Sequence, residues 1–184
     1  QADDTTIVIF SCQSLEVLKE DFATNELPYS IHLTLKGREL NNPHIISSLM
    51  EMINSQPGMT LVRSDLYTIL SEMFNNALEH GVLKLSSDLK STPDGFHQYY
   101  QRRDTLLANL TEGEIGFKIL FKPSESALDI TISDSGDGFD VSTLDEDSLT
   151  ACYGRGISFL RELCESVRFS DNGSTLSVRL SMAK

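Results

Sequence analysis

The sequence lacks any long hydrophobic run. Although 40% of its 184 residues are hydrophobic, no stretch reaches the roughly 18 consecutive apolar residues of a membrane-spanning helix. The first residues are acidic and polar, which is not the pattern of a secretory leader. A chain of this length can bury the core of one domain and is too short for two. We therefore expect a cytoplasmic domain that makes no contact with membranes.

Cysteines and cationic residues are also few. The three cysteines, Cys12, Cys152 and Cys164, do not have the spacing of metal ligands, which favours free thiols in a reducing compartment. The 15 lysines and arginines face 27 acidic residues, so the formal net charge is −12. Such a chain repels polyanions on average, and nucleic acid is not an expected partner. A nucleotide can still bind at a local site together with Mg²⁺.

The spacing of apolar residues predicts an α/β domain. Strands are predicted at 2–11, 31–35, 115–121, 127–134, 167–170 and 174–182. Helices are predicted at 42–54, 64–80, 95–110 and 154–166, the second with Ser64 as its N-cap and Gly81 as its stop signal. The expected architecture is a two-layer sandwich, in which helices pack on a mixed, mostly antiparallel sheet.

Three polar residues lie at the edge of the apolar stripe of helix 64–80. Glu72, Asn76 and His80 are four residues apart and share one side of the helix, whereas Asn75 and Glu79 are predicted further toward solvent. The stripe itself consists of Leu66, Ile69, Leu70, Met73 and Ala77. A carboxylate and an amide beside a core are costly unless hydrogen bonds satisfy them, and either a neighbouring loop or a ligand could do so. For His80, a structural role is the better interpretation.

A glycine-rich turn, DSGDG, ends the predicted strand 127–134. Asp134 shares the parity of the apolar residues of that strand, so its carboxylate is predicted to point inward and to need a donor. An adenine amino group is one donor that fits, and Gly136 and Gly138 would let a ligand approach the backbone closely. An ordinary aspartate–glycine turn would explain the same residues.

Gly154, Arg155 and Gly156 open the predicted helix 154–166 after a turn. Free amides at a helix N-terminus bind phosphate well, although a simple helix cap would have the same sequence. The sequence contains neither GxxxxGK[ST] nor GxGxxG. Neither a P-loop nor a dinucleotide-binding fold is therefore predicted.

Taken in this order, the motifs resemble those of the GHKL ATPase superfamily, which has the Bergerat ATP-binding fold. SEMFNNALEHG resembles its N box, DSGDG its first glycine box and GRGISFL its second, and Gly173 precedes the last strand. The resemblance covers about residues 27–183. Within the superfamily the chain is most similar to the anti-sigma-factor serine/threonine kinases. The stretch between its glycine boxes is short, and it lacks the histidine-bearing dimerisation helices of sensor kinases.

The resemblance implies a metal ligand and a base on helix 64–80. Asn76 would ligate Mg²⁺ through its side-chain oxygen, and the metal would bridge the phosphates of ATP. Glu72, one turn earlier, would be the general base that orients or deprotonates the attacking hydroxyl.

The resemblance also implies residues that hold the nucleotide. Asp134 would accept a hydrogen bond from the adenine amino group, and Gly136 and Gly138 would line the base. Ser174 stands where the family usually has a threonine that reaches adenine through water, and strand parity favours it over Thr175. The phosphates would lie against Gly154, Arg155 and Gly156, with Arg155 near the γ-phosphate.

The activity implied by the resemblance is that of a serine/threonine protein kinase. Its substrate would be a STAS-type anti-sigma-factor antagonist, and phosphorylation would switch which partner this antagonist binds. A sigma factor or an anti-sigma factor would be among the partners. One alternative is a module that holds ATP and sequesters a partner without turnover. Another is a histidine-kinase-like ATPase domain that acts in trans. A homodimer is also left open.

Two segments depart from the compact kinase pattern. Residues 84–114 form a longer insertion, which would be an extra packing helix or a partner surface. ADDTTIVIF resembles the closing strand of a metal-dependent phosphatase, so 1–12 is predicted as the remnant of such a domain, 13–26 as a linker and 27–184 as the kinase domain. The chain would then be the C-terminal part of a receiver–phosphatase–kinase fusion; the alternative is a fortuitous strand.

Overall fold

The computed structural model describes residues 27–56, 59–86, 90, 93–138 and 154–182. The predicted strand 2–11, the proposed phosphatase remnant 1–12 and the linker 13–26 lie outside the described residues, as do Cys12 and Cys152.

Five strands form one sheet in the order β1-β2-β3-β5-β4, and every neighbouring pair is antiparallel. They are β1 (Tyr29–Lys36), β2 (Glu114–Lys122), β3 (Ala127–Asp134), β4 (Ser166–Ser170) and β5 (Thr175–Ser181). Each lies where alternation of apolar residues predicted a strand. The inward side chains of β3 and β5 are almost completely buried, because alternate residues face the helices and the others face away.

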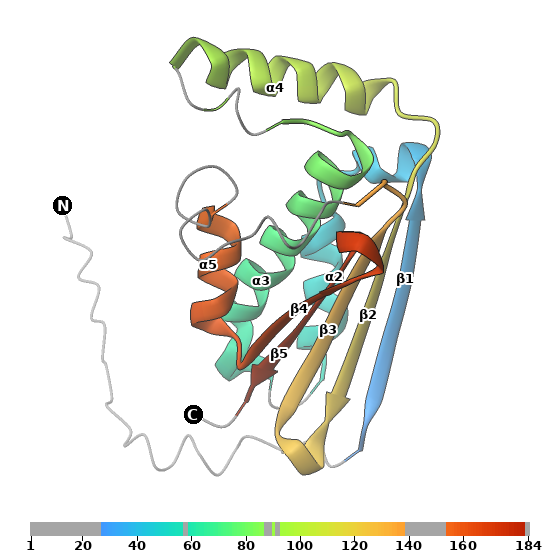
Figure 1. Cartoon of the computed structure of the whole chain (residues 1–184). Helices are drawn as coiled ribbons and strands as arrows, with labels where there is room; N and C mark the ends of the chain where they lie inside the picture. Colours follow the sequence, from blue (N-terminus) through green and yellow to red (C-terminus); the bar gives the residue numbers. More distant parts are fainter. Residues whose placement is uncertain (1–26, 57–58, 87–89, 91–92, 139–153, 183–184) are drawn as a thin grey trace, which may run out of the picture.

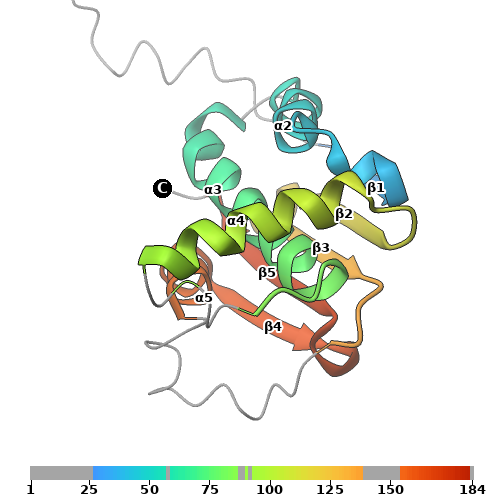
Figure 2. The same cartoon turned by 90° about the horizontal axis from the view of Figure 1, so that it is seen from above.

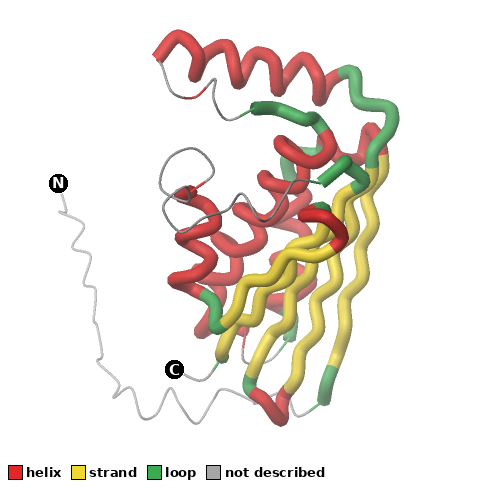
Figure 3. Tube along the Cα trace, viewed as in Figure 1, coloured by secondary structure: helices red, strands yellow, loops and turns green. Residues whose placement is uncertain are grey.

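The described helices cover one face of this sheet, and none of them lies on the other, the bare face (Figures 1 and 3). The covering layer contains α2 (Ile45–Asn54), α3 (Arg63–Asn75) and α5 (Gly154–Leu163). The predicted stripe on α3 is confirmed, since Leu66, Ile69, Leu70 and Met73 are at most 1% exposed. The predicted fold class, a two-layer α/β sandwich, is therefore confirmed.

Two details of the helix predicted at 64–80 are wrong. The N-cap of α3 is Val62, and no side chain caps it, so Ser64 already lies inside the helix. At the other end, Gly81 does not stop the helix, because a π-helical segment, η3 (Asn76–Val82), continues it. The Leu83 amide donates to the Leu78 carbonyl at 2.8 Å, which is the five-residue spacing of a π-helix. The wider turn changes which residues after Asn76 face inward.

The insertion at 84–114 contains α4 (Pro93–Ala108), which lies across the end of the two layers (Figures 1 and 2). Its Tyr99 is 0% exposed and Leu107 is buried, so it is a packing helix, as one of the two expectations had it. No helix within the described ranges combines the length and the apolar character needed to cross a membrane.

Candidate nucleotide site

The structure brings the N-box helix and the second glycine box into contact. A Cβ atom at Gly156, in the first turn of α5, would lie 2.7 Å from Oε2 of Glu72 and 3.8 Å from Nδ2 of Asn76. Glycine at this position therefore leaves room for the carboxylate and the amide. The side chains of Glu72 and Asn76 thus form one site with the N-terminus of α5, which lies more than 70 residues later in the sequence.

Asn76 is half-buried, yet its Nδ2 is buried and makes no hydrogen bond. The side chain of Glu72, also half-buried, makes no hydrogen bond or ion pair with any described residue. Buried polar groups of folded proteins are nearly always paired, so the unpaired amide of Asn76 beside the Glu72 carboxylate is an arrangement that a bound ligand would complete. A half-turn of the Asn76 amide exchanges its nitrogen and oxygen, which would present a metal ligand at the same place.

The donor set fits Mg²⁺ carried by phosphates. Within the described ranges, no three His, Cys, Asp or Glu side chains gather as a metal cage. Mg²⁺ is usually held by one or two protein oxygens together with phosphate and water, so the single amide oxygen of Asn76 is a sufficient protein contribution.

Asp134 points inward from the end of β3, as strand parity predicted. Its Oδ1 accepts a hydrogen bond from the Gly136 amide at 2.8 Å, whereas Oδ2 has no partner among the described residues. Burial raises the pKa of this carboxyl group, and the Gly136 hydrogen bond offsets only part of that rise. The carboxylate is thus held in place with one oxygen available to a donor.

Glycines surround this carboxylate for a steric reason. A Cβ atom at Gly81 or at Gly136 would lie closer than 3.0 Å to the Asp134 carboxylate. Gly138 has a φ of +71°, and a Cβ there would collide with the carbonyl oxygen of Asn172. Gly136 is therefore needed beside the carboxylate, while Gly138 is needed for the contact between two turns.

Ser174 lies directly before β5, and its carbonyl oxygen accepts the Asp134 amide at 2.9 Å. Its hydroxyl donates to the Asp171 carbonyl at 2.8 Å and so is engaged within its own turn. The inward parity of Leu176, Val178 and Leu180 agrees with the prediction.

Gly154 begins α5, so the glycines form the first helical turn and not a turn before it. The side chain of Arg155 lies outside the described residues.

The comparison with protein families agrees with this geometry. A family model for the histidine kinase-like ATPase domain matches residues 44–181, which is more than half of the chain and includes all of these motifs. The chain belongs to the histidine kinase-like ATPase family. Family membership confirms the resemblance to the GHKL superfamily and implies ATP binding, typically with Mg²⁺, and a kinase-like activity. No curated protein matches the chain significantly.

One prediction about this ATPase domain is wrong: Glu79 does not face solvent. It is only 8% exposed, because α4 covers it and Tyr99 and Arg103 donate hydrogen bonds to its carboxylate. His80 has the structural role expected of it, with Nδ1 2.7 Å from the Leu85 carbonyl oxygen. Sequence reasoning also missed Gly81 as a neighbour of Asp134. The only signal for it was its place as the last residue of the N-box motif.

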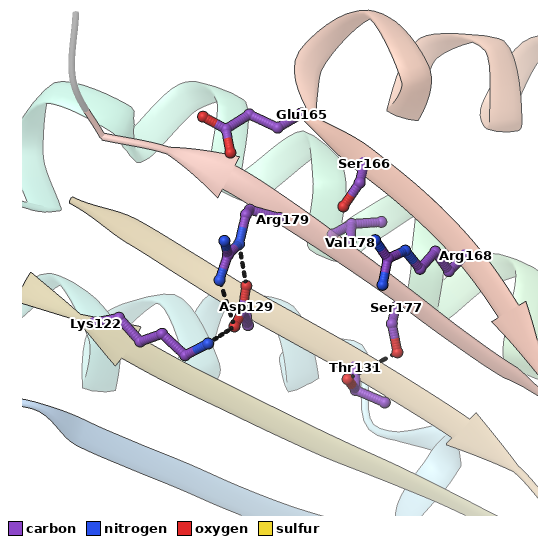
Figure 4. Close-up of a pocket in the computed structure, with 9 residues that line it drawn as sticks. All are labelled: Lys122, Asp129, Thr131, Glu165, Ser166, Arg168, Ser177, Val178 and Arg179. Carbon is purple, nitrogen blue, oxygen red and sulfur yellow. Dashed lines mark hydrogen bonds and ion pairs between the residues drawn. The ribbon is translucent and has the colours of Figure 1, made fainter. Parts of the chain in front are cut away.

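A hollow lies elsewhere, on the bare face of the sheet (Figure 4). It has a volume of about 570 Å³, and its floor is an ion-pair network. Asp129 accepts from Arg179 Nε at 2.7 Å and from Lys122 Nζ at 2.6 Å. Because these charges are already paired, the hollow offers a ligand less than the site around Glu72 and Asn76 does.

Proposed function

We propose that this domain is an ATP-dependent serine/threonine protein kinase. One observation carries the proposal. The Glu72 carboxylate has no partner among the described residues, and it lies one helical turn from the unpaired buried amide of Asn76. Both side chains face Gly156 in the first turn of α5. A domain that only binds ATP needs the amide and the helix N-terminus. It does not need a carboxylate at the place where an attacking hydroxyl would lie.

Each residue has a separate task in this proposal. Asn76 would hold Mg²⁺ through Oδ1, and the bound metal would neutralise charge on the phosphates. Glu72 would orient the substrate hydroxyl and take its proton. The amides of the first turn of α5 would bind phosphate, with Gly154 and Gly156 allowing close approach and Arg155 near the γ-phosphate. At the other end, Asp134 Oδ2 would accept from the adenine amino group; Gly136, Gly138 and Ser174 would enclose the base.

We infer that the substrate is a STAS-type anti-sigma-factor antagonist. The inference is supported by the resemblance of the motifs and by the short stretch between the two glycine boxes. A phosphate on the antagonist adds about two negative charges, which is enough to exchange one protein partner for another. If residues 1–12 do belong to a phosphatase domain, that domain would remove the same phosphate. A full-length protein whose phosphatase ignores the kinase product would overturn this last point.

The test is calorimetry of Mg²⁺-ATP binding together with phosphotransfer to a candidate antagonist. Asn76→Ala should lose the Mg²⁺-dependent part of the affinity. Glu72→Gln, which keeps the packing against Gly156, should bind ATP nearly as wild type while phosphotransfer falls about 10²- to 10⁴-fold. Acid-stable product indicates phosphoserine or phosphothreonine; an acid-labile product would indicate the histidine-kinase alternative.

Two results would contradict the kinase assignment. Wild-type binding of ATP without any phosphotransfer would favour the module that sequesters a partner. Glu72→Gln with unchanged phosphotransfer would remove the base from the mechanism. Glu51→Gln, an exposed carboxylate on α2, is the matched control and should change neither quantity.

A further inference from the structure

Glu79 is the one charged side chain that is buried in the part of the chain that the structure describes. Both of its carboxylate oxygens are hydrogen-bonded. Tyr99 Oη donates to Oε2 at 2.6 Å, and Arg103 Nε donates to Oε1 at 2.8 Å. Lys90 Nζ lies 3.2 Å from Oε2. All three partners belong to the insertion, so the insertion is attached to η3 through this carboxylate.

The attachment is strong in electrostatic terms. Burial alone would raise the pKa of Glu79, but the hydrogen bond from Tyr99 and the charges of Lys90 and Arg103 outweigh burial and lower it. Glu79 is therefore ionised at neutral pH. Tyr99 is fully buried, and Lys90 Nζ lies 4.0 Å from the centroid of its ring. Removing Glu79 would leave the buried Tyr99 hydroxyl without an acceptor and two cations without their carboxylate.

Glu79 lies within the π-helical segment η3. Helical periodicity predicted it on the solvent side of the stripe, and the insertion covers it there. In the π-helical register it faces α4, and two residues later Gly81 lies against the Asp134 carboxylate. The same register places the carbonyl oxygen of Gly81 next to Gly136. Glu79 and the glycine that packs against Asp134, the residue that would bind adenine, therefore lie in the same π-helical segment.

We propose that Glu79, held by Tyr99 and Arg103 of α4, is a positioning residue that fixes the π-helical register and thereby the selectivity of Asp134 for adenine. The insertion would then be part of the nucleotide site, although none of its side chains is expected to touch the nucleotide. This inference rests on the proposed ATP site. A purely structural role for the ion pairs makes a different prediction: stability would fall, and the preference for adenine over guanine would not change.

The experiment compares Tyr99→Phe with Tyr100→Phe. Both remove one hydroxyl from α4, but Tyr100 is 40% exposed and does not hydrogen-bond to Glu79. Affinities for ATP and GTP are measured by calorimetry with and without Mg²⁺. Tyr99→Phe should lower the ATP-to-GTP affinity ratio about 3- to 10-fold, which corresponds to the loss of one hydrogen bond. The Mg²⁺ dependence should stay, because Asn76 is at the α-helical end of η3.

A second readout does not depend on nucleotide. Amide hydrogen exchange at Leu83 and Leu85 reports the register, because these amides donate to the Leu78 and Glu79 carbonyls. Exchange at both should quicken in Tyr99→Phe and in Arg103→Lys, and not in Tyr100→Phe. Arg103→Lys keeps the charge and serves if Tyr99→Phe does not fold.

The outcomes are separable. A lower melting temperature with an unchanged ATP-to-GTP ratio would overturn the positioning role and leave the proposed function standing. A wild type that binds neither nucleotide would overturn the proposed function and the positioning role with it. A wild type that binds ATP and GTP equally would overturn only the selectivity of Asp134 and its positioning.

Discussion

Strand β3 carries two aspartates that face opposite sides of the sheet and behave in opposite ways. Asp129 faces the bare side, where hydrogen bonds from Arg179 and Lys122 lower its pKa to about 2 despite some burial. Asp134 faces the helices, where burial raises its pKa and only a backbone amide of Gly136 opposes the rise. A carboxylate with cationic partners stabilises the fold, whereas a buried carboxylate without them costs stability and remains available to a ligand.

The same contrast applies to the two ion-pair networks. The side chain of Glu79 is 10% exposed and that of Asp129 is 30% exposed, and each has an arginine and a lysine as partners. Burial therefore decides what the loss of each carboxylate costs. The cations of both networks keep 22–33% of their side-chain surface exposed, so the difference lies in the acceptor. Loss of Glu79 leaves the fully buried Tyr99 hydroxyl without a partner, whereas on the bare face water replaces the lost carboxylate.

The largest effect is expected for Glu79→Ala. It leaves the buried Tyr99 hydroxyl without an acceptor and removes the carboxylate partner of Lys90 and Arg103, and should lower the free energy of unfolding by about 3 kcal/mol. Asp129→Ala, the equivalent change on the bare face, should cost about 1 kcal/mol or less. Urea unfolding of both variants measures the difference. Equal losses would show that burial does not distinguish the two networks.

Asp134→Asn should separate function from stability. The neutral amide oxygen accepts a weaker hydrogen bond than the charged carboxylate does, so ATP affinity should fall about 10- to 100-fold. Thermal stability should stay the same or rise, because a buried charge is removed. Asp129→Asn should do the reverse and lower stability while ATP affinity is kept. Calorimetry and thermal unfolding of the two variants test the comparison.

Gly81→Ala tests the packing on Asp134. The added methyl group would collide with the carboxylate and force it to move, so stability should fall by about 1–3 kcal/mol and ATP affinity should fall with it. On the bare face, Gly116→Ala would meet only the Ser133 hydroxyl oxygen, at 3.0 Å, and should cost less. Normal ATP binding by Gly81→Ala would contradict the role of this contact.

The smallest effect concerns acid stability. The folded pKa of Asp129, about 2, lies below that of an ordinary aspartate, about 3.9, so its contribution is complete above pH 4 and is lost as pH falls toward 2. Asp134 has the opposite sign: its raised pKa means that the cost of the buried charge disappears as pH falls. Urea midpoints of Asp129→Asn and wild type should therefore converge between about pH 4 and 2.

The sequence by itself determined much of the frame. Alternation located all five described strands, and parity alone directed Asp134 inward, because a strand has a fixed period of two. Helical spacing likewise identified the core stripe of α3. The order of the motifs was enough to indicate the family. These features are local, so they can be read without knowing what packs against them.

Tertiary structure alone decided the remaining features. The periodicity of an α-helix placed Glu79 in solvent and Gly81 at a helix end, and both predictions are wrong. Glu79 is buried against Tyr99 and Arg103 of α4, which lie about twenty residues later in the sequence. No local pattern reports such a partner. Likewise, the approach of Gly156 to Glu72 and Asn76 exists only because α5 packs beside α3. Residues that form a site through packing between distant segments become visible only when the chain is folded.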